Sequence, residues 1–78
     1  MTPDQQFLTF IIQSIVDNPD DVSIERTCDE MGVFLLLTVN PKDAGRVIGV
    51  EGATAKAIRT LLKVFGMKHN SRISLKIL

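Results

Sequence analysis

Two glycines three positions apart, Gly49 and Gly52, have the spacing in this 78-residue chain that most directly suggests binding chemistry. They bracket Val50 and Glu51, and helix-forming sequence lies on both sides. A helix that ends at one glycine and restarts at the next leaves a tight turn, over which the first N–H groups of the second helix point. Such groups favour an anion, and glycines let a sugar-phosphate backbone approach the main chain. The pattern therefore predicts contact with a nucleic-acid backbone.

The residues around this turn extend the predicted site. Backbone N–H groups of residues 53–55 would face the anion, and nearby cations would neutralise phosphates. Ile48 and aliphatic residues of a predicted strand at 33–39 would form an apolar floor for bases. The predicted binding residues are Arg46, Ile48, Gly49, Val50, Glu51, Gly52, Ala53, Thr54, Lys56 and Arg59.

A purely structural interpretation of the same residues stays open. Gly49 can be the C-cap of one helix and Gly52 the N-cap of the next. Lys56, Arg59 and Lys63 repeat on one helix face, which is usual for a solvated surface.

The wider string V-I-G-V-E-G-A-T-A-K-A-I-R-T resembles the small bacterial KH proteins of the KhpA type. The resemblance is dense from Asp43 to Leu62 and, in element order, covers the whole chain. KH modules use a GXXG loop to clamp about four nucleotides of single strand. The resemblance therefore implies a single type II KH domain over residues 1–78 that binds single-stranded RNA at the G-V-E-G loop and acts as an RNA chaperone. It also implies a homodimer, and pairing with a larger KH-containing protein of the Jag type.

The loop itself departs from the family pattern, because KH domains tend to have a lysine or arginine within or just after GXXG. This chain has Val50, Glu51 and Ala53 there. The carboxylate of Glu51 lies beside the expected phosphate path, where it costs Coulomb energy, although a helix N-terminus stabilises an acid. An alternative is therefore a degenerate KH module that uses the loop for protein contact or dimerisation, with weak or no RNA binding.

A helix-turn-helix protein is a third alternative, with helix 53–65 in a DNA major groove. The first residues of that helix, Ala53, Thr54 and Ala55, are small and offer little to read base edges. The flanking strands also favour the KH interpretation.

Length and composition restrict the class of protein. A chain of 78 residues builds one domain with one modest core, and 45% hydrophobic content indicates a folded chain. The lone Cys28 cannot form an internal disulfide, which fits a reducing compartment. Because no apolar run approaches about 20 residues and no basic signal-peptide start is present, we expect a cytoplasmic protein without a membrane span.

The net charge of zero conceals a division between the two halves of the chain. Residues 1–40 contain seven acids and one arginine, net −6, whereas residues 41–78 contain eight cations and two acids, net +6. A basic side can attract a polyanion, or it can attract the acidic side of a second copy.

Catalytic chemistry finds little support. His69 is the only histidine and has no second ligand at metal-binding spacing. Cys28, near the end of a strand, is expected to be a small buried residue rather than a nucleophile. We therefore predict no enzyme activity, no metal and no cofactor.

Hydrophobic periodicity predicts an α+β fold in the order α-β-β-α-α-β. We expect a first helix from Pro3 that ends at Asp17-Asn18-Pro19, strands at 22–27 and 33–39, a short helix capped by Asn40 and Asp43, and a helix at 53–65 with Gly66 as its C′ residue. A loop at 67–71 and a strand at 72–78 follow. The right-handed crossover rule then gives a three-stranded mixed sheet, order 1-2-3, with three helices on one face. The very apolar first helix would supply core or a dimer face.

Overall fold

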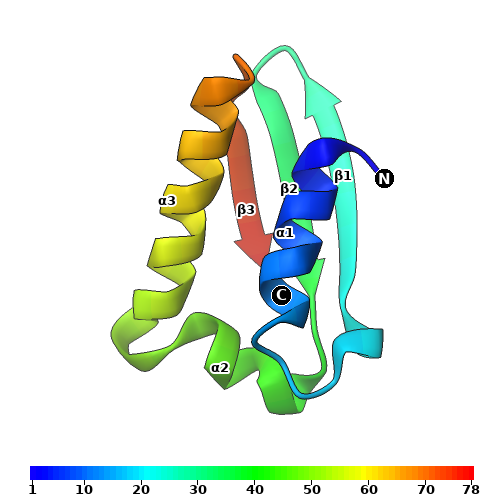
Figure 1. Cartoon of the computed structure of the whole chain (residues 1–78), viewed down its shortest axis with the longest axis vertical. Helices are drawn as coiled ribbons and strands as arrows, with labels where there is room; N and C mark the ends of the chain where they lie inside the picture. The colour runs from blue at the N-terminus through cyan, green and yellow to red at the C-terminus, as the bar shows by residue number, and fades with distance from the viewer.

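The helices and strands of the polypeptide follow the predicted order α-β-β-α-α-β. The computed structural model describes residues 1–78. Three one-turn 3₁₀ helices, at Pro19–Asp21, Pro41–Asp43 and Val50–Gly52, connect the longer elements. The elements are α1 (Pro3–Gln13), β1 (Ser23–Asp29), β2 (Gly32–Thr38), α2 (Ala44–Ile48), α3 (Ala53–Lys68) and β3 (Ile73–Ile77) (Figure 1).

The sheet has the strand order β1-β2-β3, as expected. β1 and β2 form an antiparallel hairpin in which Ser23 lies opposite Thr38, and β2 pairs in parallel with β3 from Val33 opposite Ile73. A parallel return requires a long crossover, which α2 and α3 provide. β2 is therefore the central strand.

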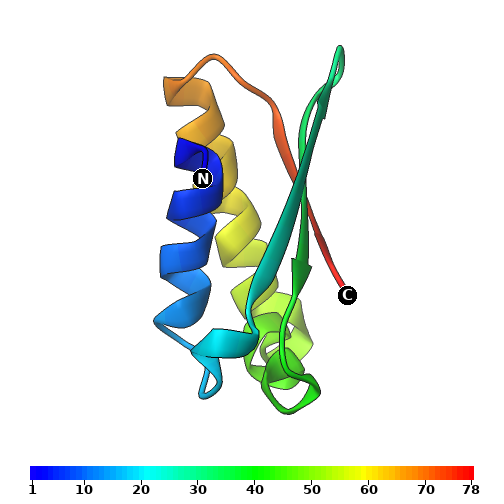
Figure 2. The ribbon, with the colours of Figure 1, turned by 90° about the vertical axis from the view of Figure 1, so that its right-hand side faces the viewer.

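The helices cover one face of the sheet and leave the other bare, which Figure 2 shows edge-on. Side chains alternate along β2, so that Val33, Leu35 and Leu37 are buried beneath the helices while Phe34 points to the opposite face. The core beneath the helices is completed by Leu8, Ile12, Val16, Val39, Val47, Ile58 and Leu62.

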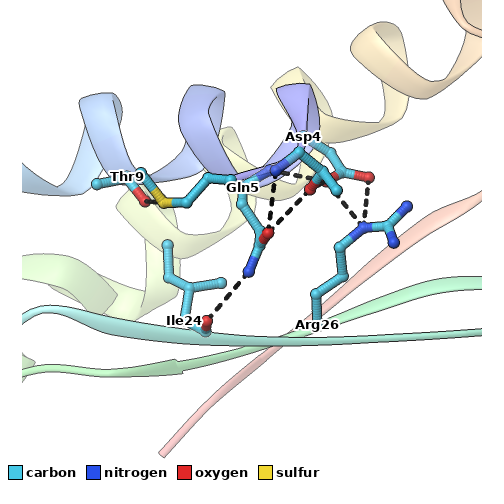
Figure 3. A network of polar contacts seen from close by, with 7 residues as sticks. Asp4, Gln5, Thr9, Ile24 and Arg26 are labelled. Carbon is cyan, nitrogen blue, oxygen red and sulfur yellow. Dashed lines mark hydrogen bonds and ion pairs between the residues drawn. The ribbon is translucent and has the colours of Figure 1, made fainter.

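Arg26 of β1 holds the N-terminal turn of α1 against the sheet (Figure 3). Its Nε donates to both carboxylate oxygens of the buried Asp4, at 3.0 and 3.1 Å. Asp4 also accepts bonds from the Thr2 hydroxyl and the Gln5 N–H. Burial by itself raises the pKa of Asp4, but these hydrogen bonds and the charge of Arg26 outweigh burial and hold it below its usual value. The Gln5 side chain accepts the Thr2 N–H at 3.2 Å, which forms a capping box at the start of α1.

The prediction that α1 continues to Asp17 is wrong. The helix ends at Gln13, and the Ser14 hydroxyl donates to the Phe10 carbonyl at the last turn. Val16 then enters the core, while the N–H groups of Asp17 and Asn18 bond to the distant Asp43. A long-range partner, absent from the local sequence, therefore ends this helix early.

β1 begins one residue later than predicted and runs two residues further, to Asp29. The extension follows from its pairing with β2, in which Asp29 lies opposite Gly32. Cys28 is exposed, so its predicted burial is also wrong. The β1–β2 hairpin projects beyond the N-terminal end of α1, and no helix covers its tip (Figure 1).

Gly66 is not the C′ residue of α3, because the helix continues to Lys68. Gly66 is buried, and a Cβ there would lie less than 3.0 Å from the Ser71 carbonyl oxygen. The Ser71 N–H donates to the Gly66 carbonyl at 2.8 Å. The glycine therefore allows the segment before β3 to cross α3 closely.

We predict that Gly66→Ala destabilises the fold by about 1–3 kcal/mol, since an added methyl must displace backbone. This would occur although alanine is about 1 kcal/mol better than glycine within a helix. Gly45→Ala in α2 is the matched control, because nothing lies within 4 Å of its Cβ position. Urea unfolding of both variants tests this, and a stabilised Gly66→Ala would contradict it.

Candidate nucleic-acid interface

The turn between α2 and α3 contains three residues with positive φ among four. Gly49 has φ +77°, Glu51 +55° and Gly52 +75°. Gly49 is the C-cap of α2 and Gly52 the N-cap of α3, so both predicted caps are confirmed. The Gly49 N–H donates to the Gly45 carbonyl at 2.8 Å and the Gly52 N–H to the Gly49 carbonyl at 3.2 Å. The backbone is thus folded tightly over residues 49–52.

The two glycines are required for different reasons. A Cβ on Gly49 would lie less than 3.0 Å from the side chain and backbone N of Thr54, in the first turn of α3. Nothing lies within 4 Å of the corresponding position on Gly52. Gly49 therefore provides space and conformation, whereas Gly52 provides conformation alone.

We predict that Gly52→Ala costs about 1–2 kcal/mol, the usual penalty for an L-residue in left-handed backbone. Gly49→Ala should cost more, because its φ and ψ, +77° and 175°, lie in a region that only glycine populates and the new methyl also meets Thr54. Thermal unfolding measures both variants. Equal losses of stability in the two variants would contradict the prediction, because they would show that Thr54 can move away from the new methyl without cost.

The tip of the turn presents an apolar and an acidic side chain. Val50 is 85% exposed, and Glu51 is exposed beside it. No side chain caps the N-terminus of α3, and the Ala53 N–H donates to the Val50 carbonyl. Ala53 is exposed and Thr54 half-buried. The turn therefore combines an open helix N-terminus with a negative charge.

Asp43 positions α2, and with it the whole turn. Its carboxylate is only 2% exposed and accepts the N–H groups of Asp17 and Asn18, at 3.2 and 3.0 Å, and the Asn18 side-chain amide, at 3.1 Å. Asn40 caps the segment as predicted, accepting the Lys42 N–H at 2.8 Å. The predicted contribution of the Asp43 side chain to that cap is wrong, because the carboxylate bonds to the α1–β1 connection instead.

The same contacts set the acidity of Asp43. Burial by itself raises its pKa, but the hydrogen bonds from Asp17 and Asn18 and the charge of Arg46 outweigh burial and lower it below the ordinary 3.8. A lowered folded-state pKa means that the ionised carboxylate stabilises the fold fully above 3.8. That contribution is lost as the pH falls through 3.8 towards the folded-state value.

We therefore predict that Asp43→Asn is less stable than wild type at neutral pH and that the difference narrows as the pH falls below about 4. Asp20→Asn, at an exposed acid in the 3₁₀ helix after α1, is the matched control and should follow the wild type. Urea unfolding between about pH 2.5 and 7 tests this. A stability difference that does not change over that range would contradict it.

A cleft of about 540 Å³ lies between α3 and β3. Three cations line it, Arg59 and Lys63 from α3 and Arg72 from the segment before β3. None is in an ion pair, because the only two pairs are Arg26–Asp4 and Arg46–Asp17. The remaining lining residues are Leu62, Met67, Ser71, Ile73, Ser74 and Leu75. The cleft therefore has a partly apolar lining and an uncompensated positive charge.

The structure places the predicted site residues in two groups. Residues 49–52 form the turn and residues 53–54 begin α3. Lys56 and Arg59 follow on the exposed side of α3, with Arg59 in the cleft. Ile48 is 44% exposed at the end of α2. Arg46 is partly engaged elsewhere, since its guanidinium pairs with Asp17 at 3.1 Å.

The predicted floor from the second strand is wrong. The helix-facing residues of β2 are buried core, and the apolar lining of the cleft comes from Leu62, Ile73 and Leu75 instead. Sequence reasoning left Lys63, Arg72 and the two serines out of the site. The helical spacing of Lys63 from Arg59 was a usable signal, whereas Arg72 joins them only because β3 returns beside α3.

Neither a candidate membrane-spanning helix nor a cluster of metal-ligating side chains is present in the structure. No helix is both long and apolar enough to span a membrane. No three side chains among His, Cys, Asp and Glu lie together as metal ligands would. His69 instead stacks on Phe65, with ring centroids 4.3 Å apart.

Comparison with known proteins finds a matching family model and several relatives of this chain. The family model described as "KhpA/KhpB, KH domain" matches residues 5–77. A protein of Clostridium acetobutylicum named RNA-binding protein KhpA is 42% identical over 74 residues, which cover 95% of this chain and 99% of the relative. Proteins of the same name from Chlamydia pneumoniae and Leifsonia xyli are 40% and 44% identical, over 95% and 85% of this chain and 95% and 87% of theirs. No solved structure gives a significant match.

Proposed function

The chain belongs to the KhpA/KhpB family of KH domains, and from that premise we propose that it is a non-enzymatic protein that binds single-stranded RNA. Residues 1–78 would act as one type II KH domain. The observation that supports this most strongly is the run of unpaired cations along α3, from the glycine turn into the cleft beside β3. The names of the relatives support the same ligand.

In this proposal the RNA backbone crosses residues 49–52. The glycines allow close approach, and the N-terminus of α3 at Thr54 favours a phosphate, while the Ala53 N–H stays bonded to the Val50 carbonyl. Lys56 and Arg59 hold the next phosphates, and bases enter the cleft against its apolar lining. Arg46 and Ile48 border the path at the end of α2. Backbone contacts of this kind give little sequence preference, which suits an RNA chaperone or a subunit of a larger assembly.

The charges predict how strongly binding depends on salt. Four cations, Lys56, Arg59, Lys63 and Arg72, lie along the proposed path without an acidic partner. Four phosphate contacts on a single strand give a log–log slope of about −2.8, hence a loss of about 50-fold in affinity from ~50 to ~200 mM salt. Glu51 opposes this attraction at the loop.

Fluorescence anisotropy of a labelled, unstructured RNA at these two salt concentrations tests the proposal. Arg59→Gln with Lys63→Gln should weaken binding and reduce the slope to about −1.4, whereas Glu51→Lys should strengthen binding. Lys68→Gln is the matched control, because nine residues from Arg59 place it on the opposite side of α3. Absence of salt-dependent binding by both wild type and Glu51→Lys would contradict the proposal.

A second candidate is favoured by the exposed Val50 at the tip of the loop, where KH domains tend to have a cation. Here the loop would contact protein: a second copy of the chain, forming a homodimer, or a larger KH-containing protein of the Jag type. RNA binding by Glu51→Lys but not by wild type would favour this candidate. Val50→Lys with Glu51→Lys should then weaken self-association in sedimentation, and an unchanged dimer constant would count against it.

A further inference from the structure

A hollow of about 260 Å³ lies on the sheet face opposite the helices. Its lining includes Glu25 and Thr27 from β1, Phe34 and Leu36 from β2, and Ser74 and Lys76 from β3. Phe34 is 39% exposed, whereas two other phenylalanines, Phe7 and Phe65, stack on each other between α1 and α3 with centroids 4.8 Å apart. Phe34 is thus the aromatic ring available on this face.

This hollow adjoins the cationic cleft. Ser74 and Leu75 line both, because β3 is the edge strand that separates them. Phe34 pairs with Ser74 across the ladder, so its ring lies one strand, about 4.8 Å, inside that edge. A single-stranded RNA that leaves the cleft over β3 therefore reaches Phe34 next, with no other helix or strand of the protein between the cleft and Phe34.

Around Phe34, the positive charge lies on the side nearer the cleft and the negative charge on the far side. Lys76, two residues along β3 from Ser74, lies diagonally across from Phe34 within reach of a side chain and forms no ion pair. The acid of the hollow, Glu25, lies on β1, on the side away from the cleft. A phosphate of the RNA would therefore contact Lys76 on the edge strand β3, and only the base would extend inwards towards Phe34.

We propose that this face is an additional nucleotide subsite, in which a base of single-stranded RNA leaving the cleft stacks on Phe34 and its phosphate is bound by Lys76. Ser74 lies opposite Phe34 on β3, and its hydroxyl can hydrogen-bond the RNA as the RNA crosses the edge of the sheet. Every base has a π-face, so the subsite extends the bound length of RNA without selecting sequence. The subsite rests on the RNA-binding function proposed above.

The test compares an unstructured RNA of about four nucleotides, the length a GXXG loop clamps, with one of about ten. Phe34→Leu should bind the longer RNA about 5- to 150-fold more weakly, the effect expected of one lost base–aromatic stack, and should bind the shorter RNA as wild type does. Phe34→Tyr should retain the affinity for the longer RNA. Lys76→Gln should make the slope of log affinity against log salt less negative by about 0.7, and it should do so for the longer RNA alone.

Phe10→Leu is the matched control, since Phe10 is exposed on α1, in the helix layer. Unfolding curves establish that the Phe34 variants are folded at the assay temperature. Equal affinities of Phe34→Leu and Phe10→Leu for the longer RNA would overturn the subsite while leaving the binding of the shorter RNA, and so the proposed function, intact. A Phe34→Leu variant that binds RNA normally but dimerises less would also overturn it and assign the face to a second copy.

Discussion

The left-handed backbone between α2 and α3 is the constraint on which the rest of the structure depends. Positive φ values at Gly49, Glu51 and Gly52 reverse the chain within four residues. That reversal lets α3 lie against the sheet with Ile58 and Leu62 in the core, and it brings β3 back parallel to β2. The open N-terminus of α3 and the cleft beside β3 are both consequences of this one turn.

Two buried carboxylates fix the helices against the rest of the fold. Asp4 joins the start of α1 to Arg26 of β1, and Asp43 joins the start of α2 to the segment that follows α1. No buried side-chain polar atom lacks a partner. Because a buried carboxylate is tolerated only where its hydrogen bonds are made, each acid favours one arrangement of the helices over others.

The turn at residues 49–52 has the backbone geometry of a KH loop but lacks the positive charge that such loops tend to have. Its geometry suits a phosphate backbone, but Val50 and Glu51 supply no cation at the tip. The unpaired positive charge lies instead along α3 and at Arg72, next to an apolar lining. Electrostatic attraction would therefore come from the cleft, and the loop would contribute backbone approach and N–H groups.

The sequence by itself determined the features that local chemistry specifies. The element order and the cap at Asn40 follow from hydrophobic periodicity and from the conformations that glycine and proline allow. So do the end of α2 at Gly49 and the start of α3 at Gly52. The string from Asp43 to Leu62 was also sufficient to indicate the family.

Only the tertiary structure decided the features that depend on partners distant in sequence. α1 ends early because Asp43 bonds to Asp17 and Asn18, and Gly66 lies inside α3 because Ser71 crosses it. Arg72 joins Arg59 in one cleft because β3 returns beside α3. Local propensity contains no information about such contacts, since their energy arises only when the packed sheet and helices bring the two segments together.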